Sequence, residues 1–375
     1  MPGIKLDNVS LTLGKNKILD KLTLEIDSGE YFSLVGETGA GKTSILNLVS
    51  GLIRPTSGRI LIGEKDVTKV LAEDRDIGMV FEDYALFPHY DVLKNVTYSH
   101  RVHDKDPGET RKAAREILNL MLLYKRDDAL PVELSGGMQQ RVALARSLMT
   151  NLGILLLDDP LSALDAGLRM SLRIELKNLA KELGTTVIHC TNDIEEAMIV
   201  GTRMAIIKDG KIEQLGTPND IYFKPENLYV FEFLGDVNLL RCKIDEVDME
   251  REYYFLTYET KDSFRKFRTK IKQPPYFKAG DEVILGVRAE HFSIRAGYRK
   301  KPNRIKGIIE EISFLGHRIR YEIADEFGET RTVQRFMSER TKHMRFQVGE
   351  AVTIYYRSTF GYLFPIPINE DKTKI

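Results

Sequence analysis

Short apolar runs alternate with amphipathic segments through the N-terminal part of the chain. Alternating apolar and polar residues predict antiparallel strands over residues 4–13 and 22–26, and the apolar run YFSLVG (Tyr31 to Gly36) predicts a buried strand that ends in a glycine loop. Because strands that alternate with helices form parallel sheets covered on both faces, the fold class is α/β. The other elements predicted here are strands at residues 153–157, 185–190 and 203–208 and helices at residues 110–124, 166–183 and 194–200.

The pattern changes near residue 235. From residue 238 onward the apolar positions follow a period of two in short stretches that turn residues separate, which predicts a small, mostly β barrel. Residues 217–235 form the predicted connector between the two parts. The clearest strands predicted after it lie at residues 282–287, 305–312, 318–323 and 351–356.

The composition is that of a soluble globular protein, with hydrophobic residues at 42% of its 375 positions. Lys+Arg and Asp+Glu both number 55, so no basic excess favours nucleic acid, and we expect no nucleic-acid partner. The apolar runs are shorter than the roughly 20 residues that cross a bilayer, and MPGIKLDNVS lacks a signal core, so we expect a cytosolic protein. Cys190 and Cys242 lack metal-ligand spacing and are expected to be buried thiols.

The octapeptide GETGAGKT, from Gly36 to Thr43, fits the phosphate-loop pattern G-x-x-x-x-G-K-[ST]. It follows a predicted strand and opens a helix, so backbone N–H groups can surround phosphates while Lys42 reaches the terminal phosphates. The Thr43 hydroxyl is then placed to bind Mg²⁺. The predicted phosphate-binding residues are Gly36, Glu37, Thr38, Gly39, Ala40, Gly41, Lys42, Thr43 and Ser44.

Two adjacent aspartates end the apolar run in ILLLDDPLSALD (Ile154 to Asp165). Asp158 closes a predicted buried strand, which is where a P-loop enzyme places the metal-binding aspartate of its Walker B motif. Asp159 is then placed to act on water. The two Walker motifs together predict a P-loop NTPase whose metal ligands include Thr43 and Asp158.

A third anion site is predicted in LSGGMQQR, from Leu134 to Arg141. Ser135, Gly136 and Gly137 stand where a helix begins, and a helix N-terminus offers unsatisfied N–H groups and the positive end of a dipole. A lone Ser-Gly-Gly can be a simple turn. Its place shortly before the Walker B strand favours a nucleotide-binding role.

These motifs resemble those of the ATP-binding cassette (ABC) transporter ATPases, and more narrowly the importer ATPases for maltose, sulfate, molybdate or tungstate, iron and polyamines. The resemblance is most specific over residues 29–235, and GVRAEHF (Gly286 to Phe292) extends it into the C-terminal part. It implies an ABC nucleotide-binding domain at residues 1–235, with a helical subdomain at about 85–150. A regulatory, OB-like barrel of the TOBE type would follow at residues 236–375. Further family-like stretches are DRDIGMVFEDYALFPH (Asp74 to His89) and the D-loop SALD (Ser162 to Asp165).

The resemblance also implies how such a chain works. Two cassettes would dimerise head to tail, so that each ATP, with Mg²⁺, lies between the Walker motifs of one chain and the signature serine and glycines of the other. By the same resemblance, Asp165 of the D-loop is also expected to be a nucleotide-binding residue. The second cassette would be another copy of this chain or a different ATPase subunit.

Two integral-membrane permease subunits are the other implied partners, which would hold the chain at the cytoplasmic face of the inner membrane. They would dock near residues 82–96, where Tyr84, Leu86, Phe87 and Pro88 are apolar. Packing in the protein core explains these four residues equally well, and some of them could do both.

Four positions depart from the family's pattern. The family has a glutamate after the Walker B aspartate, a glutamine before the FPH stretch and a histidine in T-H-D, whereas this chain has Asp159, Glu82 and Asn192. The family's adenine-stacking aromatic, in its second strand, corresponds to Leu13. His189 lies inside a predicted strand, so we expect it to be structural and not a replacement for the missing histidine.

Each departure alters the chemistry expected of the catalytic residues. Asp159 is one methylene shorter than glutamate, and a displacement of about 1 Å can cost on the order of 100-fold in rate. Glu82 adds a negative charge that could bind Mg²⁺, repel the γ-phosphate or act as a substitute base. Asn192 can donate a hydrogen bond to a phosphate but cannot carry an imidazolium charge.

We therefore hypothesise an importer ATPase subunit whose own Walker site is slow or degenerate and which pairs with a competent ATPase. The signature motif keeps Ser135, Gly136 and Gly137, and only Met138 replaces a commonly polar residue. The alternatives are a non-catalytic nucleotide sensor that regulates a partner, and a soluble ABC ATPase of DNA repair or translation. The chain has one cassette and no net charge, which disfavours the last class. The transported solute stays open.

Overall fold

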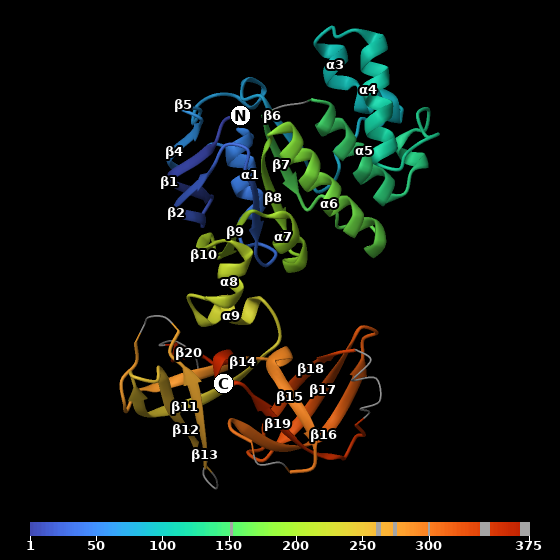
Figure 1. Ribbon diagram of the computed structural model, residues 1–375. Helices are drawn as coiled ribbons and strands as arrows, with labels where there is room; N and C mark the ends of the chain where they lie inside the picture. Colours follow the sequence, from blue (N-terminus) through green and yellow to red (C-terminus); the bar gives the residue numbers. More distant parts are fainter. Residues whose placement is uncertain (151–152, 260–263, 273–275, 299–300, 338–345, 368–375) are drawn as a thin grey trace. The chain divides into compact units, whose positions relative to one another are not determined.

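A computed structural model describes residues 1–150, 153–259, 264–272, 276–298, 301–337 and 346–367 (Figure 1). The chain divides into two compact units, Met1–Phe223 and Lys224–Ile375. The division falls before the predicted boundary at residue 235, because Phe231 is fully buried in a cluster with Ile284, Tyr362 and Phe364 of the second unit. The predicted connector therefore contributes one of its helices to the C-terminal core.

The described strands of the first unit form a four-stranded sheet, β2-β1-β4-β5, and a six-stranded sheet, β10-β9-β3-β8-β7-β6. Neighbours from β9 to β6 pair in parallel, whereas β10 is antiparallel to β9. The predicted parallel sheet is thus confirmed, with an antiparallel strand at one edge. The strands are β1 (Ile4–Leu13), β2 (Asn16–Ile26), β3 (Tyr31–Val35), β4 (Ser57–Ile62), β5 (Lys65–Asp66), β6 (Ile77–Val80), β7 (Ile154–Asp158), β8 (Thr186–Thr191), β9 (Arg203–Lys208) and β10 (Lys211–Gly216).

Helices cover the six-stranded sheet, and α3, α4 and α5 gather at one end of the unit (Figure 1), where α2 contacts all three. The pattern over residues 110–124 predicted α4 too late, because Asp106 caps it and Pro107 starts it. It ends at Leu120, since Leu122 takes a left-handed backbone angle (φ 54°). The α-helices are α1 (Lys42–Ser50), α2 (Val92–Val96), α3 (Tyr98–Val102), α4 (Pro107–Leu120), α5 (Gly136–Met149), α6 (Ala166–Leu183), α7 (Ile194–Val200) and α8 (Pro218–Phe223), with 3-10 turns η1 (Ala72–Asp74) and η2 (Pro131–Glu133).

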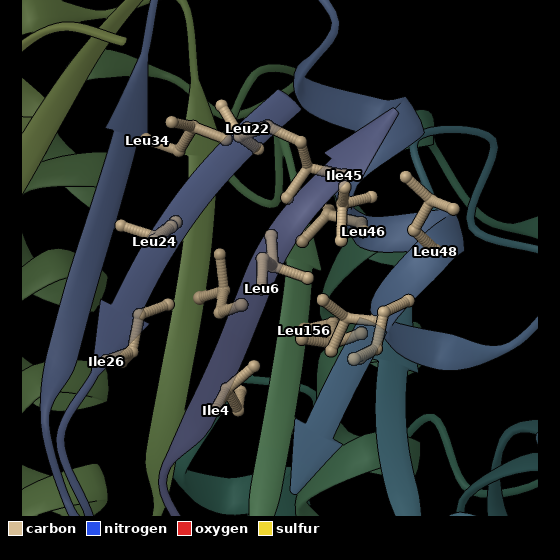
Figure 2. Packing of buried hydrophobic residues seen from close by; sticks show 14 of the residues in the cluster. Ile4, Leu6, Leu22, Leu24, Ile26, Leu34, Ile45, Leu46, Leu48 and Leu156 are labelled. Carbon is tan, nitrogen blue, oxygen red and sulfur yellow. The ribbon is translucent and has the colours of Figure 1, made fainter. Parts of the chain in front are cut away.

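A hydrophobic core joins α1 to both sheets. Figure 2 shows Leu6 of β1, Ile45 of α1 and Leu156 of β7 packed into this core, and each is 1% exposed or less. A second cluster on the other face of the six-stranded sheet includes Leu157 of β7 and Leu176 of α6. The ends of β3, β7 and β8, which carry the motif residues, are therefore fixed by packing from both sides.

The second unit is mostly β, as predicted. Its described strands form two five-stranded sheets, β13-β12-β11-β14-β20 and β15-β19-β16-β17-β18, that share one core containing Leu285 of the first sheet and Ile354 of the second. Its elements are α9 (Leu228–Phe233), β11 (Val237–Asp248), β12 (Tyr253–Glu259), β13 (Phe264–Lys270), β14 (Glu282–Arg288), η3 (Ala289–His291), β15 (Phe292–Ala296), β16 (Arg304–Phe314), β17 (Arg318–Asp325), β18 (Thr330–Phe336), β19 (Ala351–Tyr356), η4 (Ser358–Phe360) and β20 (Tyr362–Pro365).

The two cysteines and the lengths of the helices can be compared with the sequence predictions. Cys190 and Cys242 are both buried and free, which confirms their role as small core residues. None of the helices in the described ranges combines the length and the apolar character needed to cross a bilayer.

We predict that Phe231→Ala lowers the stability of the second unit by about 3–5 kcal/mol, because it removes a fully buried ring from the cluster with Phe364. Native-state hydrogen exchange of the β14 amides measures this free energy. Phe264→Ala is the control: its ring is 63% exposed, so its loss should change the exchange little. Equal effects of the two substitutions would show that Phe231 does not belong to the core of this unit.

Candidate functional site

The loop after β3 has the backbone geometry that its glycines allow. A Cβ on Gly36 would lie 2.3 Å from the carbonyl oxygen of Ile207, so only glycine fits where the loop crosses β9. Gly39 and Gly41 have φ angles of 86° and 105°, which other residues rarely adopt. The loop therefore folds tightly against the sheet, and α1 begins at Lys42 with its N-terminal N–H groups at the loop.

Lys42 uses its three donors on acceptors of the protein. Its Nζ donates to the carbonyl oxygens of Gly36 (2.7 Å) and Glu37 (2.9 Å) and to Oδ1 of Asn192 (2.7 Å). The residue is only 9% exposed, and burial lowers its pKa, while Asp158, Asp159 and Glu82 are close enough to oppose that shift. A phosphate oxygen that binds here must take a donor from one of these three contacts.

Thr43 and Asp158, the two residues predicted to bind Mg²⁺, lie near each other. Burial raises the pKa of Asp158, the Thr43 side chain opposes that rise, and the negative charge of Glu82 adds to it. A hydroxyl and a carboxylate are oxygen ligands that suit Mg²⁺ when phosphates supply the rest. Among the described residues, His, Cys, Asp and Glu side chains do not gather in threes as a metal site.

The backbone around Asp159 is held on both sides. Its N–H donates to the carbonyl oxygen of Cys190 (2.9 Å), and its own carbonyl accepts from Gln140 Nε2 (3.2 Å) and Ser162 Oγ (3.1 Å). The φ angle of 46° is unusual for an aspartate. Since this backbone is fixed, the side chain cannot gain the length of a missing methylene by moving the chain.

The electrostatic environment of Asp159 favours its protonated form. Burial raises the pKa of Asp159, Glu196 raises it further, and His189 opposes the rise. Glu82, which follows β6, is exposed and contributes a smaller increase. The two carboxylates are thus near enough to repel each other.

His189 belongs to a buried network. Its ring nitrogens contact the hydroxyl of Tyr31 (2.9 Å) and Oε1 of Glu196 (2.7 Å), and it is fully buried. Burial alone would raise the pKa of Glu196, but the hydrogen bonds from His189 and Arg173 hold it below its usual value. The structure confirms that His189 is a core residue and does not take the place of Asn192 at Lys42.

The signature residues and Asp165 lie at the starts of two helices. Ser135 caps α5, and Asp165 caps α6 by accepting from the Leu168 N–H (3.0 Å). Ser135, Gly136 and Asp165 are exposed, as residues that serve another chain would need to be. A Cβ on Gly137 would lie 3.1 Å from the carbonyl oxygen of Ala163, so the start of α5 packs against the D-loop.

The predicted docking stretch is divided between core and surface. Tyr84 and Leu86 pack against the second core cluster, so core packing explains these two. Pro88 is exposed and Phe87 is half-buried, with its ring 5.4 Å from the Arg146 guanidinium. These two stay candidates for a docking surface.

Three further residues lie at or near the site: the apolar Leu13 and the polar Gln140 and Arg169. Leu13 ends the first strand, β1, which matches the strand predicted over residues 4–13, and it is 52% exposed. Gln140 and Arg169 were not singled out from the sequence, although both hold the segment that follows Asp159. A buried glutamine inside a helix, such as Gln140 at 1% exposure, was the available signal.

Comparisons with known proteins agree with this geometry. The ABC transporter family model matches residues 19–162, and the TOBE domain model matches residues 285–364. A relative is the spermidine/putrescine import ATP-binding protein PotA of Thermotoga maritima, 33% identical over 93% of this chain and 92% of its own length. Another is the Fe(3+) ions import ATP-binding protein FbpC of Brucella abortus, which is 37% identical over 88% of this chain and 90% of its own length. The ATP-binding cassette MJ0796, solved as a dimer with ADP and Pi, is 34% identical, covers 57% of this chain and 98% of its own, and has a TM-score of 0.54.

We predict that Asp158→Asn stabilises the ligand-free protein at neutral pH by about 1 kcal/mol, because the ionised carboxylate is only 5% exposed. Since burial raises the folded-state pKa of Asp158, the wild-type penalty grows as pH rises through the unfolded value, and the advantage of the variant shrinks towards pH 4. Thermal unfolding midpoints at pH 7.5 and 4.5 test this. Asp27→Asn, at a carboxylate that is 77% exposed, is the control, and a gain independent of pH would contradict the cause given.

Proposed function

The chain belongs to the ABC transporter family, as an ATP-binding subunit of the import class, and on this premise we propose that it binds Mg·ATP tightly but hydrolyses it slowly at its own site. The contact between Lys42 and Asn192 carries the proposal, because it puts an amide where the family has a histidine. An asparagine accepts from Lys42 and can donate to a phosphate, but it gains no positive charge as negative charge develops on the transferred group.

Binding of the nucleotide is supported by residues that fit its parts. The loop from Gly36 to Gly41 offers a close backbone approach, Lys42 offers an ammonium, and Thr43 with Asp158 offers oxygen ligands for the metal. Bound Mg²⁺ would neutralise phosphate charge and orient the γ-phosphate for in-line attack. The chain's own residues must then position a water and accept its proton.

The residues that would position the water and accept its proton differ from those of the family. Asp159 directly follows the Walker B aspartate Asp158, and hydrogen bonds to Cys190 and Gln140 hold its backbone in place. Burial raises its pKa, which keeps the carboxylate basic, but its shorter reach leaves the water badly placed. Glu82 brings a further negative charge near the phosphates where the family has a neutral amide.

We infer that the chain works with a different, competent cassette. In a head-to-tail dimer, Ser135, Gly136 and Gly137 would complete the partner's nucleotide site, and these residues keep the family's identity and an exposed helix start. The slow site would then hold ATP while the partner's site turns over. Two integral-membrane permeases complete the complex, docking at the half-buried Phe87 and the exposed Pro88, and those partners select the solute.

A nucleotide sensor that regulates a partner ATPase without driving transport is the second candidate. The altered residues Glu82, Asp159 and Asn192 are the observation that favours it. Copurification separates the two proposals: a transport subunit retains two membrane proteins in mild detergent, and a free sensor retains none.

We predict that the isolated chain turns over bound ATP slowly and that Asp159→Glu raises the single-turnover rate by about 10- to 100-fold, because glutamate restores the missing reach. Adding Glu82→Gln and Asn192→His should raise it further. Rapid-quench measurement of one turnover with radiolabelled ATP gives these rates.

The matched control for this series is Asp83→Glu, which lengthens an exposed acid next to Glu82 and should leave the rate unchanged. Rapid turnover by the wild-type chain alone would contradict the proposed slow site. A rise with Asp83→Glu as large as that with Asp159→Glu would show that reach at residue 159 is not the limit.

We also predict that Leu13→Tyr tightens ATP binding by about 5- to 10-fold, because an aromatic ring at the exposed end of β1 can stack on adenine. Calorimetry with ATP and with inorganic triphosphate distinguishes the cause. Stacking predicts a gain for ATP alone, whereas an equal gain for triphosphate would place the effect away from the base.

A further inference from the structure

Arg169 on α6 joins the D-loop (Ser162–Asp165) to the loop that follows β8. Its Nη2 donates to the carbonyl oxygens of Ser162 (3.3 Å) and Leu164 (2.8 Å), and its Nη1 lies 3.8 Å from Oδ2 of Asp193. The side chain is 30% exposed, so these contacts are partly shielded from water. One guanidinium group therefore spans two segments that are far apart in the sequence.

Asp193 is held firmly at the other end of this bridge. Its Oδ1 caps α7 through the Glu196 N–H (3.0 Å), and its Oδ2 lies 2.5 Å from Nη2 of Arg173. Arg173 is only 7% exposed and also pairs with Glu196 at 3.1 Å. A displacement of the backbone at Asp193 is therefore passed to α6 and is not lost in solvent.

The residue before Asp193 contacts the phosphate loop. Asn192 accepts from Lys42 at 2.7 Å, so hydrogen bonds, ion pairs and one peptide bond form a continuous path from Lys42 to the D-loop. A phosphate oxygen that takes the donor now used by Asn192 would release this end of the path.

Gln140 connects the D-loop to the signature helix α5. Its Nε2 contacts the Asp159 carbonyl (3.2 Å) and Ser162 Oγ (3.4 Å), and its Oε1 accepts from the Ala163 N–H (3.3 Å). Because the glutamine is 1% exposed, these bonds do not compete with bulk water. A displacement of the D-loop would therefore be transmitted through Gln140 to the first turns of α5.

We propose that Arg169 is a positioning residue that couples phosphate binding at Lys42 to the D-loop and to the signature helix of the same chain. This rests on the proposed function, because it requires phosphate at Lys42. Arginine suits the role, since its planar fork holds its N–H donors in fixed directions and can face two segments at once. In a subunit that hydrolyses slowly, bound ATP then acts as a signal that sets the surface offered to the partner cassette.

The test is hydrogen exchange of the full-length chain with and without a saturating non-hydrolysable ATP analogue and Mg²⁺. In the wild type, the analogue should change the exchange of peptides that cover residues 135–140 and 162–165 by about fivefold. Arg169→Met keeps the apolar stem but removes the bridge, and its response in both peptides should fall below about twofold. Calorimetry on each variant confirms saturation.

A second variant guards against misfolding. Asp193→Asn keeps an N-cap for α7 but removes the charge that faces Arg169 and Arg173, and it should weaken the response in the same way. Lys177→Met is the matched control, because Lys177 also ties α6 to the region of α7, through the Ile199 carbonyl (2.7 Å). That variant should keep the wild-type response.

Three results would overturn the coupling. They are an Arg169→Met chain that responds like the wild type, a Lys177→Met chain that loses the response equally, and a wild-type chain that binds the analogue without any change in exchange. Failure of the wild type to bind the analogue is a separate outcome, seen directly by calorimetry. It removes the proposed function together with the coupling that rests on it.

Discussion

Lys42 carries its charge into a space with little water, and the arrangement of the site follows from what that charge requires. A buried ammonium is costly unless each of its donors is used, and here two carbonyls of the loop and the Asn192 amide use them. The loop can present those carbonyls because Gly39 and Gly41 take left-handed backbone angles. One interaction thus ties the loop, the start of α1 and the end of β8 together.

Carboxylates lie near that ammonium in greater number than it can neutralise. Asp158, Asp159 and Glu82 all act to raise the pKa of Lys42, and Glu82 also raises the pKa values of Asp158 and Asp159. A triphosphate adds more negative charge, so under the proposed function the metal does more here than in a site with a neutral amide at residue 82. Tight metal-dependent binding and slow transfer are compatible, because the charge that attracts Mg²⁺ also opposes the developing negative charge of the reaction.

Local sequence predicted the elements whose boundaries depend on local chemistry. The predicted ranges of α6 and α7 match the structure, since aspartates cap both helices and apolar residues repeat along them. The contacts of Asn192 and Gln140 could not be predicted in this way. They depend on the parallel register of β3 with β8, which pairs Val35 with Thr191, and on how α5 packs beside the end of β7. Local sequence could not place Phe231 in the second unit for the same reason, because its burial depends on strands much later in the chain.

The two halves of the nucleotide machinery meet on one rigid element. α6 begins at the Asp165 cap and runs for 18 residues, and Arg169 and Arg173 lie four residues apart on it, so both face the same side. The D-loop and the loop carrying Asn192 are therefore both tied to one helix. The slow hydrolysis proposed above would leave this connection intact, because Asp159 takes part in it through its backbone and not through its carboxylate. Under the proposed function, a chain with a shorter catalytic acid can for that reason still pass the presence of ATP to the surface where Ser135 is exposed.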